Sequence, residues 1–343
     1  MRWQLMVKAL SVSAFMGLLL LLVNQQWGSW ISSMDPWPSS QKAPSEDPLV
    51  LSSRKFEWET QTPHPLELRY PYSYPFLINH PDKCGGLRDA PFLLILVMSK
   101  PQDVGIRQVI RQTWGNETLV PGVVIRCLFV LGLPPPLFAQ KLQDLLAEED
   151  KEHGDLLQVG FLDTYRNLTL KVLMGLEWMA QYCPTAQYVL KVDSDVFLNP
   201  TFLVQQILQP NRPLKLNFIT HIFRNSVPLW MQGHKWYMPP ELYPQNMYPE
   251  YCAGLGYVMS GSLALRILTE AQRVKVIHLE DVFVGLCLQQ LKVKPTPSPP
   301  NTFLIFWRKY DHCTFHQLVL VHHFQHQELL RIWPDFLRAT TSC

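Results

Sequence analysis

Apolar runs of strand length, separated by segments of helix length, constrain the fold of this chain more than any other feature. The runs lie at 92–97, 123–131, 156–159 and 188–192, and the helices expected between them lie at 103–114, 138–149 and 166–182. Asp103 could cap the first of these helices. Strands that are apolar on both faces and alternate with helices are typical of a parallel sheet covered on both sides. We therefore expect an α/β fold with a mostly parallel sheet.

Asp193, Ser194 and Asp195 follow directly after the strand expected at 188–192. Open α/β sheets bind ligands at the carboxyl ends of their strands, and two carboxylates suit a divalent cation that also holds a diphosphate. The same tripeptide is short and common, and most instances are solvated turns. Its place after a buried strand strengthens the interpretation as a metal site, and both interpretations stay open on this motif alone.

The N-terminal segment has the pattern of a membrane anchor. An uncharged run at 9–23 follows two basic residues, and no further Lys or Arg occurs before Lys42. A cleaved signal peptide is the alternative, since the apolar core is short. No small-residue cleavage site follows the run, so we expect a transmembrane helix at 9–31, with a cytosolic tail at 1–8 and the rest of the chain in the lumen.

A proline-rich stretch at 32–85 follows the expected anchor. Its prolines interrupt any helix or central strand, which is typical of a spacer. We expect this stem to hold a domain at 86–343 away from the membrane. The aromatic residues between Tyr70 and Phe76 are expected to pack on that domain already.

Sequons and cysteines agree with a lumenal location. Two Asn-x-Thr sequons begin at Asn116 and Asn167, although each is weak evidence alone. Seven cysteines fit disulfides in an oxidising compartment and show neither a C-x-x-C pair nor zinc spacing. Their connectivity stays open, and the odd count leaves at least one thiol free or paired with another chain. A net charge of +2 implies no broad basic surface for nucleic acid.

Charged residues near the expected strand ends each admit two interpretations. Arg107 and Arg111 share one helix face, where they could hold a pyrophosphate or extend along the surface, which spacing alone favours. Asp163 could cap the following helix, or it could lie with Lys171 beside a nucleotide. These alternatives call for different contacts in the folded chain.

The C-terminal half adds a candidate base and a candidate metal ligand. Glu280 and Asp281 stand where a helix is expected to start, so they either favour its dipole or supply a general base. His322 follows an apolar run and is either a packed side chain or an imidazole ligand for the Asp pair. The segment 212–249 is rich in aromatic residues and proline. Long loops of this kind often form substrate pockets.

An ordered set of segments resembles the β-1,3-galactosyltransferase group of a Golgi β-1,3-glycosyltransferase family. The matching segments lie at 106–115, 161–165, 167–171, 191–197, 248–257 and 279–287. Each motif is weak alone, whereas the ordered set is specific, and the resemblance runs from about Cys84 to the C-terminus. It implies a GT-A fold, in which a nucleotide-binding α/β sheet joins a smaller acceptor-binding part. It also implies a UDP-sugar donor, Mn²⁺, inversion of the anomeric carbon and a single-pass type II Golgi membrane protein.

The resemblance also implies a role for individual residues. Asp193 and Asp195 would hold Mn²⁺ and the diphosphate, with His322 as third protein ligand and Ser194 in the donor site. Asp281 would take the proton from the acceptor 3-hydroxyl. The residues implied at the UDP site are Arg107, Arg111, Asp163 and Lys171, and those implied at the acceptor are Trp236, Tyr237 and Glu280. Metal and cations would stabilise the departing UDP, and no covalent intermediate is needed.

Departures from the family pattern leave the donor sugar open. We expect galactose transfer from UDP-galactose in β1-3 linkage to terminal GlcNAc of glycoprotein or glycolipid glycans. However, Leu255 and Met259 resemble the N-acetylgalactosaminyl member, so N-acetylhexosaminyl transfer is an alternative. His221 and Ile222 replace the usual Gly and Tyr, and Ala253 replaces a usual Ser.

Two further functions are weighed against transfer. The changes at His221 and Ile222 motivate a non-catalytic lumenal binding protein of the same fold, but every implied metal and base residue is retained. A sugar hydrolase would need two carboxylates flanking one bond, which the Asp pair does not suggest. The expected partners are a UDP-sugar, a glycan acceptor and the membrane, without nucleic acid, and a homo- or heterodimer is left open.

Overall fold

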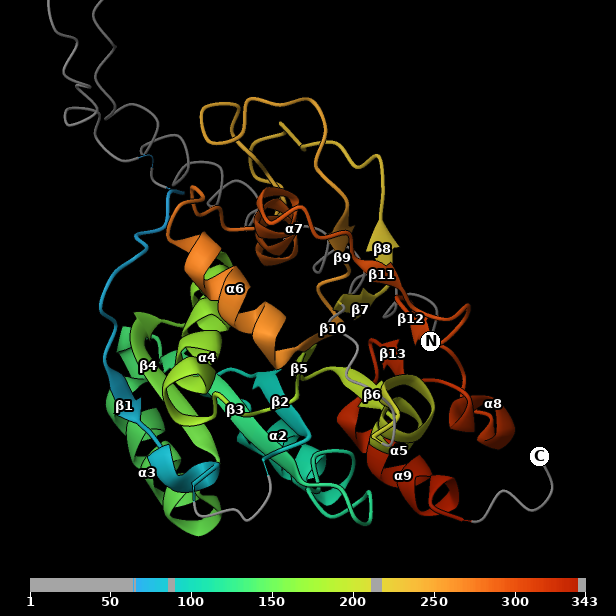
Figure 1. Cartoon of the computed structure of the whole chain (residues 1–343). Coiled ribbons are helices and arrows are strands. Elements are labelled where there is room, and N and C mark those ends of the chain that lie inside the picture. The colour runs from blue at the N-terminus through green and yellow to red at the C-terminus, as the bar shows by residue number, and fades with distance from the viewer. Residues whose placement is uncertain (1–63, 65, 86–89, 211–217, 339–343) are drawn as a thin grey trace, which may run out of the picture. The chain divides into compact units, whose positions relative to one another are not determined.

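The computed structural model describes residues 64, 66–85, 90–210 and 218–338 (Figure 1). The anchor expected at 9–31 and most of the stem lie outside these described residues. Within the described part of the chain, no helix is both long enough and apolar enough to cross a membrane.

An eight-stranded sheet forms the centre of the molecule, in the order β1-β4-β3-β2-β5-β10-β7-β11. Its strands are β1 (Phe76–Ile78), β2 (Leu93–Met98), β3 (Ile125–Leu133), β4 (Leu156–Leu162), β5 (Tyr188–Asp193), β7 (Phe218–Thr220), β10 (Gly256–Ser260) and β11 (Thr296–Pro297). The four strands β4, β3, β2 and β5 run parallel. Strands β1 and β10 join them antiparallel. The expected α/β fold with a mostly parallel sheet is confirmed.

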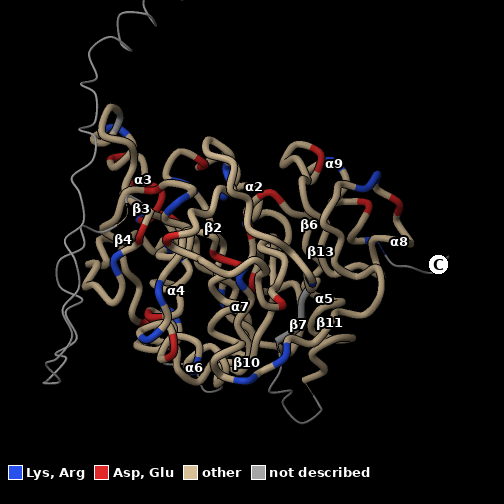
Figure 2. Tube along the Cα trace, turned by 90° about the horizontal axis from the view of Figure 1, so that it is seen from above, with Lys and Arg blue, Asp and Glu red and all other residues tan. Residues whose placement is uncertain are grey.

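Helices cover both faces of this sheet. The main ones are α2 (Val104–Gln112), α3 (Ala139–His153), α4 (Leu168–Tyr182), α6 (Gly261–Ala271), α7 (Glu280–Gln290) and α9 (His326–Phe336). Alternate residues of β2 face opposite sides: Leu94 and Leu96 pack with α4, α6 and α7, and Leu93 and Ile95 pack with α2, α3 and α9. Seen from above, the sheet lies between these two groups (Figure 2). Because both faces are buried, its strands are apolar throughout.

Two small sheets extend the main one on the side of β5. Strands β12 (Phe303–Leu304), β13 (Leu320–His322) and β6 (Val196–Leu198) form one, and β8 (Ile222–Phe223) pairs with β9 (Tyr251–Cys252) in the other. Helices α5 (Pro200–Phe202) and α8 (His312–His316) are short. In the first small sheet, His322 lies opposite Val196. This pairing places His322 next to the Asp193–Asp195 turn, which directly precedes β6.

The folded domain begins earlier than the expected boundary at residue 86. Strand β1 pairs with β4 in the main sheet, and Leu66 is buried in the core. A disulfide joins Cys84 to Cys183. The aromatic residues expected to pack on the domain include Tyr70 and Phe76, which contact its core. Part of the expected stem is therefore a structural part of the domain.

Local details differ from the expectations at two places. Asp103 occupies the residue before α2, but its side chain makes no capping hydrogen bond. Cys127, Cys252 and Cys287 are free and buried, whereas Cys313 is disulfide-bonded. The odd cysteine count thus corresponds to three buried thiols.

Candidate active site

The turn between β5 and β6 meets the end of β13 at a cluster of metal-ligand side chains. His322 Nε2 lies 3.4 Å from Asp195 Oδ1, and His323 Nδ1 lies 3.9 Å from Asp195 Oδ2. One ligand atom from each of the three residues lies within 4.8 Å of the others. Carboxylate oxygen suits Mn²⁺, and imidazole is a common ligand of divalent transition metals. The structure therefore brings together Asp195 and His322, and it adds His323, which the sequence analysis missed.

In this cluster, Asp195 and His322 each stabilise the charged form of the other. Burial alone would raise the pKa of Asp195, but the hydrogen bond and charge of His322 outweigh burial and lower it. Burial alone would lower the pKa of His322, but Asp195 outweighs it and raises that pKa. Asp193 is not one of these three residues, and its Oδ1 accepts a hydrogen bond from Lys191 Nζ at 2.9 Å. Ser194 is partly exposed between the two carboxylates.

Asp281 lies in the first turn of α7 with a strongly perturbed carboxyl group. Its Oδ1 accepts a hydrogen bond from Val282 N at 2.9 Å. Burial, with a smaller effect of the neighbouring Glu280 charge, raises the pKa of Asp281 to about 7. A carboxylate that titrates near neutral pH is a competent general base. The sequence expectation of a base at this helix start fits these surroundings.

Glu280 does not have the surroundings of an acceptor-binding residue. Only 3% of its surface is exposed. Its Oε1 accepts a hydrogen bond from the Tyr257 hydroxyl, and its Oε2 lies 3.2 Å from Lys191 Nζ. The expectation that Glu280 contacts the acceptor is therefore corrected, because its carboxylate points into the protein.

Asp163 and Lys171 form a buried ion pair at the carboxyl ends of the parallel strands. Lys171 Nζ lies 2.8 Å from Asp163 and donates to the Ser99 carbonyl at 2.7 Å. Asp163 also accepts a hydrogen bond from Gly132 N at 2.8 Å. Burial lowers the pKa of Lys171, and the Asp163 charge opposes that effect. The pair lies at the sheet edge where a nucleotide is expected, and Asp163 holds β3, β4 and α4 together.

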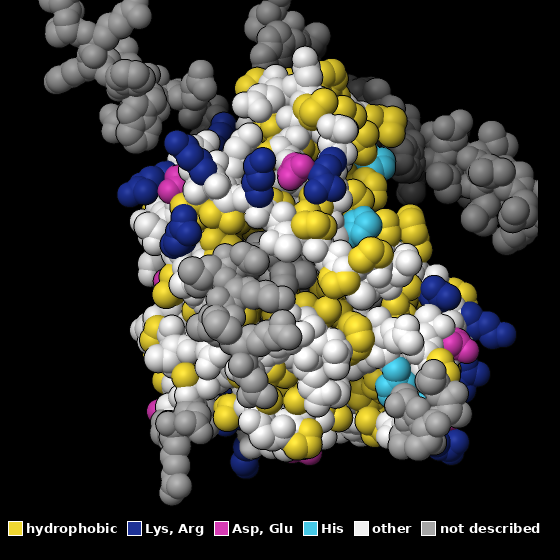
Figure 3. Space-filling model, turned by 45° about the vertical axis from the view of Figure 1, so that its right-hand side comes forward, with side chains coloured by type: hydrophobic (Ala, Val, Ile, Leu, Met, Phe, Trp, Pro, Cys, Tyr) yellow, Lys and Arg dark blue, Asp and Glu magenta, His cyan; other side chains and the backbone are white. Residues whose placement is uncertain are grey.

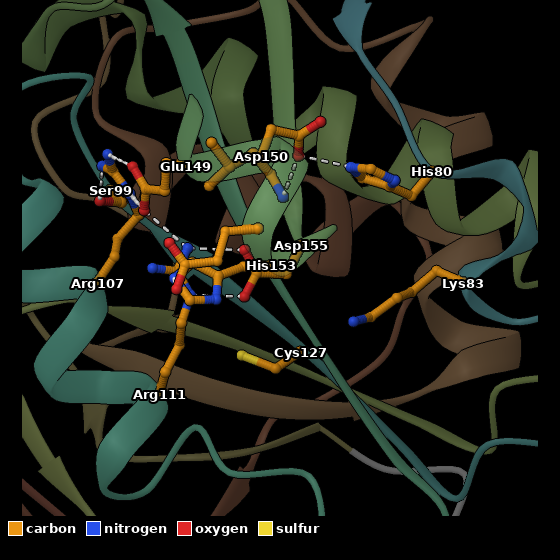
Figure 4. Close-up of polar contacts among 12 residues, drawn as sticks. His80, Lys83, Ser99, Arg107, Arg111, Cys127, Glu149, Asp150, His153 and Asp155 are labelled. Atoms are coloured by element: carbon orange, nitrogen blue, oxygen red, sulfur yellow. Dashed lines mark hydrogen bonds and ion pairs between the residues drawn. The ribbon is translucent and has the colours of Figure 1, made fainter. Parts of the chain in front are cut away.

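Arg107 and Arg111 are committed to a different cluster (Figure 4). An arginine has five N–H donors, and those of Arg107 bind Glu149, Ser99 and the carbonyls that follow β2. Arg111 binds both oxygens of Asp155 and one of Glu149. The expectation that Arg107 lines a UDP site is corrected, since all its donors bind within the protein. Arg111 also ties α2 to α3 and to the start of β4, but its Nη1 makes no hydrogen bond to a described residue.

Trp236 and Tyr237 differ in exposure. Trp236 is 47% exposed, and its Nε1 donates to the Tyr165 hydroxyl at 2.9 Å. Tyr237 is half-buried and packs against the core. Lys235 Nζ lies 5.2 Å from the Tyr165 ring and 5.0 Å from the Trp236 ring. Tyr165 belongs to a motif that the sequence analysis matched, but its pairing with Trp236 across 71 positions left no local signal.

Other exposed hydrophobic side chains lie in the same irregular segment as Trp236, which agrees with the loops expected there. They include Val227, Trp230, Met231 and Met247. Yellow side chains gather at the top of the space-filling view (Figure 3). This segment therefore presents exposed aromatic and apolar side chains, with charged ones such as Lys235 among them.

The two sequons have different surroundings. Asn116 is exposed, and its Oδ1 accepts hydrogen bonds from Thr118 N and Thr118 Oγ1 at 3.0 and 2.8 Å. Asn167 is half-buried and donates to the Leu162 carbonyl at 2.8 Å, while Thr169 is buried. Asn116 is therefore the more exposed of the two asparagines in the folded chain.

The departures from the family pattern lie close to β9 and to the metal cluster. His221 O accepts a hydrogen bond from Ala253 N at 2.7 Å. His221 also lines a shallow pocket with residues 303–308. Within that segment, the Ile305 backbone forms a hydrogen bond with His322. The His221 position can therefore influence a surface beside the metal cluster.

Comparisons with known proteins find named relatives of this chain. The family model described as Galactosyltransferase matches residues 106–299. Beta-1,3-galactosyltransferase 2 of Homo sapiens is 43% identical over 278 residues, which cover 80% of this chain and 64% of that protein. The Mus musculus protein of the same name gives the same figures. Beta-1,3-galactosyltransferase 1 of Mus musculus is 36% identical over 289 residues, covering 84% of this chain and 85% of that protein.

The resemblance to solved structures is low. A glycosyltransferase involved in the glycosylation of the major capsid of PBCV-1 aligns with a TM-score of 0.39 and 12% identity, covering 71% of this chain and 100% of that chain. The family model covers more than half of this chain. A relative at 36% identity is itself covered over most of its length. This chain therefore belongs to the galactosyltransferase family.

Proposed function

We propose that this protein transfers galactose from UDP-galactose in β1-3 linkage to terminal GlcNAc of glycoprotein or glycolipid glycans. Two observations carry the proposal. A carboxylate–imidazole cluster lies beside the Asp-Ser-Asp turn, and buried Lys191 joins Asp193 of that turn to Glu280, the residue before the Asp281 base. The names of the relatives support galactose as the sugar and β1-3 as the linkage.

Mn²⁺ bound by Asp193, Asp195 and His322 would supply Lewis-acid stabilisation of the charge on the departing diphosphate. Asp281 removes the proton from the acceptor hydroxyl, and its raised pKa makes it a stronger base than an ordinary carboxylate. Lys171, held by Asp163, supplies positive charge near the sheet edge at which the diphosphate binds. Trp236 and Tyr165 offer aromatic surface to the acceptor sugar. A single displacement then inverts the anomeric carbon.

The proposal includes the setting of the enzyme. The transmembrane helix expected at 9–31 would anchor it in the Golgi membrane, with the domain in the lumen. The disulfide between Cys84 and Cys183 supports an oxidising compartment. Fluorescence microscopy of the tagged full-length chain, with protease protection of its C-terminus, tests this part.

The first experiment tests donor and metal together. A secreted chain starting at Ser32 is incubated with a β-GlcNAc acceptor and UDP-galactose, UDP-GlcNAc or UDP-GalNAc, in Mn²⁺ or in EDTA. We expect transfer from UDP-galactose in Mn²⁺ only, and none from the folded variants Asp195→Ala and Asp281→Asn. Transfer that survives either substitution would remove that residue from its role.

N-acetylhexosaminyl transfer is the second candidate, since Leu255 and Met259 resemble that type of relative. Faster transfer from UDP-GalNAc or UDP-GlcNAc than from UDP-galactose would establish it. A folded protein that binds no UDP in Mn²⁺ by calorimetry would instead favour the non-catalytic function.

A further inference from the structure

Lys191 is a buried cation that touches both sides of the active site. Its side chain has no exposed surface, and its Nζ lies 2.9 Å from Asp193 Oδ1 and 3.2 Å from Glu280 Oε2. Burial alone would lower the pKa of Lys191, but the two carboxylates outweigh burial and raise it. One ammonium group therefore joins a carboxylate on the metal side to the residue that directly precedes Asp281.

Glu280 is held from both of its oxygens. The Tyr257 hydroxyl donates to Oε1, while Oε2 faces Lys191 and makes no hydrogen bond to any described residue. Tyr257 lies directly opposite Lys191 in the antiparallel pairing of β10 with β5. Directly opposed residues share one face of a sheet, so these two strands jointly fix the Glu280 carboxylate.

Gly254 adds a second connection between Lys191 and the base. Its carbonyl oxygen accepts a hydrogen bond from Lys191 Nζ. A Cβ atom at Gly254 would lie only 3.3 Å from Asp281 Oδ2. A glycine allows this close approach of backbone to carboxylate. Lys191 thus reaches Asp281 along two short routes, one through Glu280 and one through Gly254.

Stability alone gives little reason for this arrangement. Replacing a buried ion pair by well-packed apolar side chains is often neutral or stabilising. A hydrogen bond to one oxygen of a buried carboxylate and an ion pair at the other do, however, fix its orientation. A reacting group displaced by about 1 Å can cost about 100-fold in rate. We therefore expect the Lys191–Glu280 pair to orient the reacting groups rather than to stabilise the fold.

We propose that Lys191 and Glu280 are positioning residues, whose buried ion pair holds the Asp281 carboxylate in register with Asp193. The base is then placed to receive the acceptor proton while the diphosphate leaves. This inference rests on the proposed transferase function. Because neither side chain is exposed to substrate, losing the pair affects the reaction step more than donor binding.

Substitutions in the full-length chain test the pair by separating kcat from KM. We expect Glu280→Gln and Lys191→Met each to lower kcat by about 10- to 100-fold. The KM for UDP-galactose in Glu280→Gln stays within about twofold, because no donor contact is lost. The double variant is expected to lose about as much kcat as Lys191→Met alone, since that change already breaks the ion pair with Glu280. Calorimetry with UDP and Mn²⁺ gives a readout independent of turnover, and Glu280→Gln should keep its affinity.

Glu149→Gln is the matched control. The Glu149 side chain is 4% exposed against 2% for Glu280, and it also pairs with a fully buried cation, Arg107. We expect Glu149→Gln to lower the melting temperature and to leave kcat per folded molecule unchanged. Tyr257→Phe is a milder probe that removes only one hydroxyl, and a smaller loss of kcat is expected.

The outcomes separate the two hypotheses. Wild-type kcat in folded Glu280→Gln or Tyr257→Phe would overturn the positioning role, as would an equal loss of kcat in Glu149→Gln. No transfer by the wild-type chain from any UDP-sugar would overturn the proposed function itself. If the variants at 191 and 280 do not fold, the result for Tyr257→Phe decides.

Discussion

At the scale of single residues, Asp281 links the structure to a pH dependence. Its pKa is raised to about 7, first by burial and then by the Glu280 charge. A base must be unprotonated, so we expect kcat to rise about tenfold per pH unit below pH 7 and to level off above it. The rate from pH 5 to 8.5 at saturating donor and Mn²⁺ checks this limb. A profile that stays flat down to pH 5 would contradict Asp281 as the base.

The paired imidazoles give a second prediction at this scale. His322 lies nearer to Asp195 than His323 does, and the His323 side chain is 61% exposed. We expect His322→Ala to raise the Mn²⁺ concentration for half-maximal rate by about 10- to 100-fold, comparable to the loss of a metal's supporting contacts. A smaller effect is expected for His323→Ala. Metal titrations of both variants show which histidine contributes more to Mn²⁺ binding. A larger effect of His323→Ala would make His323, and not His322, the main imidazole ligand.

At the scale of helices, the Arg107–Glu149 pair stabilises the packing of α2 against α3 without contacting a ligand. Breaking a buried pair from one side costs about 3–5 kcal/mol. We therefore expect Arg107→Met to lower the free energy of unfolding by that amount and to leave UDP affinity unchanged in the folded fraction. Lys171→Met, at the sheet edge, should instead weaken UDP binding. Urea unfolding measures the change in stability, and calorimetry measures UDP affinity. Lost UDP affinity in Arg107→Met would show that Arg107 does belong to the nucleotide site.

Secondary structure was predictable where the pattern was local. The apolar runs expected at 92–97 and 188–192 became Leu93–Met98 and Tyr188–Asp193. Strands β6 and β13 have three residues each and pair across more than a hundred positions, so the sequence shows short apolar runs but not their pairing. Their pairing is what brings His322 to Asp195. The sequence could offer His322 as one possible ligand of the Asp pair, but its contact with Asp195 depends on this long-range pairing.

Side-chain partners were less predictable than elements. The spacing of Arg107 and Arg111 correctly gave one helix face, but it could not show that Glu149 and Asp155 lie opposite that face. Glu280 likewise looked like a surface acid at a helix start, although Lys191 and Tyr257 bury it. In each case a charge was satisfied by a residue distant in sequence. Such pairings depend on tertiary packing and not on local spacing.

At the scale of the whole molecule, the segment before β2 decides whether the domain is stable alone. A disulfide that closes 99 residues contributes about 4–5 kcal/mol. That is a large part of the roughly 5–15 kcal/mol that stabilises a typical domain. We expect a secreted chain starting at residue 62 to be soluble and to unfold cooperatively. A chain starting at residue 86 loses β1, the buried Leu66 and this disulfide, so it should aggregate or be retained in the cell.

Two controls separate the contributions to this result. Cys84→Ser in the longer chain removes the disulfide and keeps β1, so an intermediate melting temperature is expected. Cys183→Ser in the shorter chain removes the thiol left without a partner, and it should not restore folding. Secretion yield and thermal unfolding compare the four chains. Equal melting temperatures for the chains starting at 62 and 86 would show that β1 and its disulfide are dispensable, and the domain boundary would then lie at residue 86 as the sequence alone suggests.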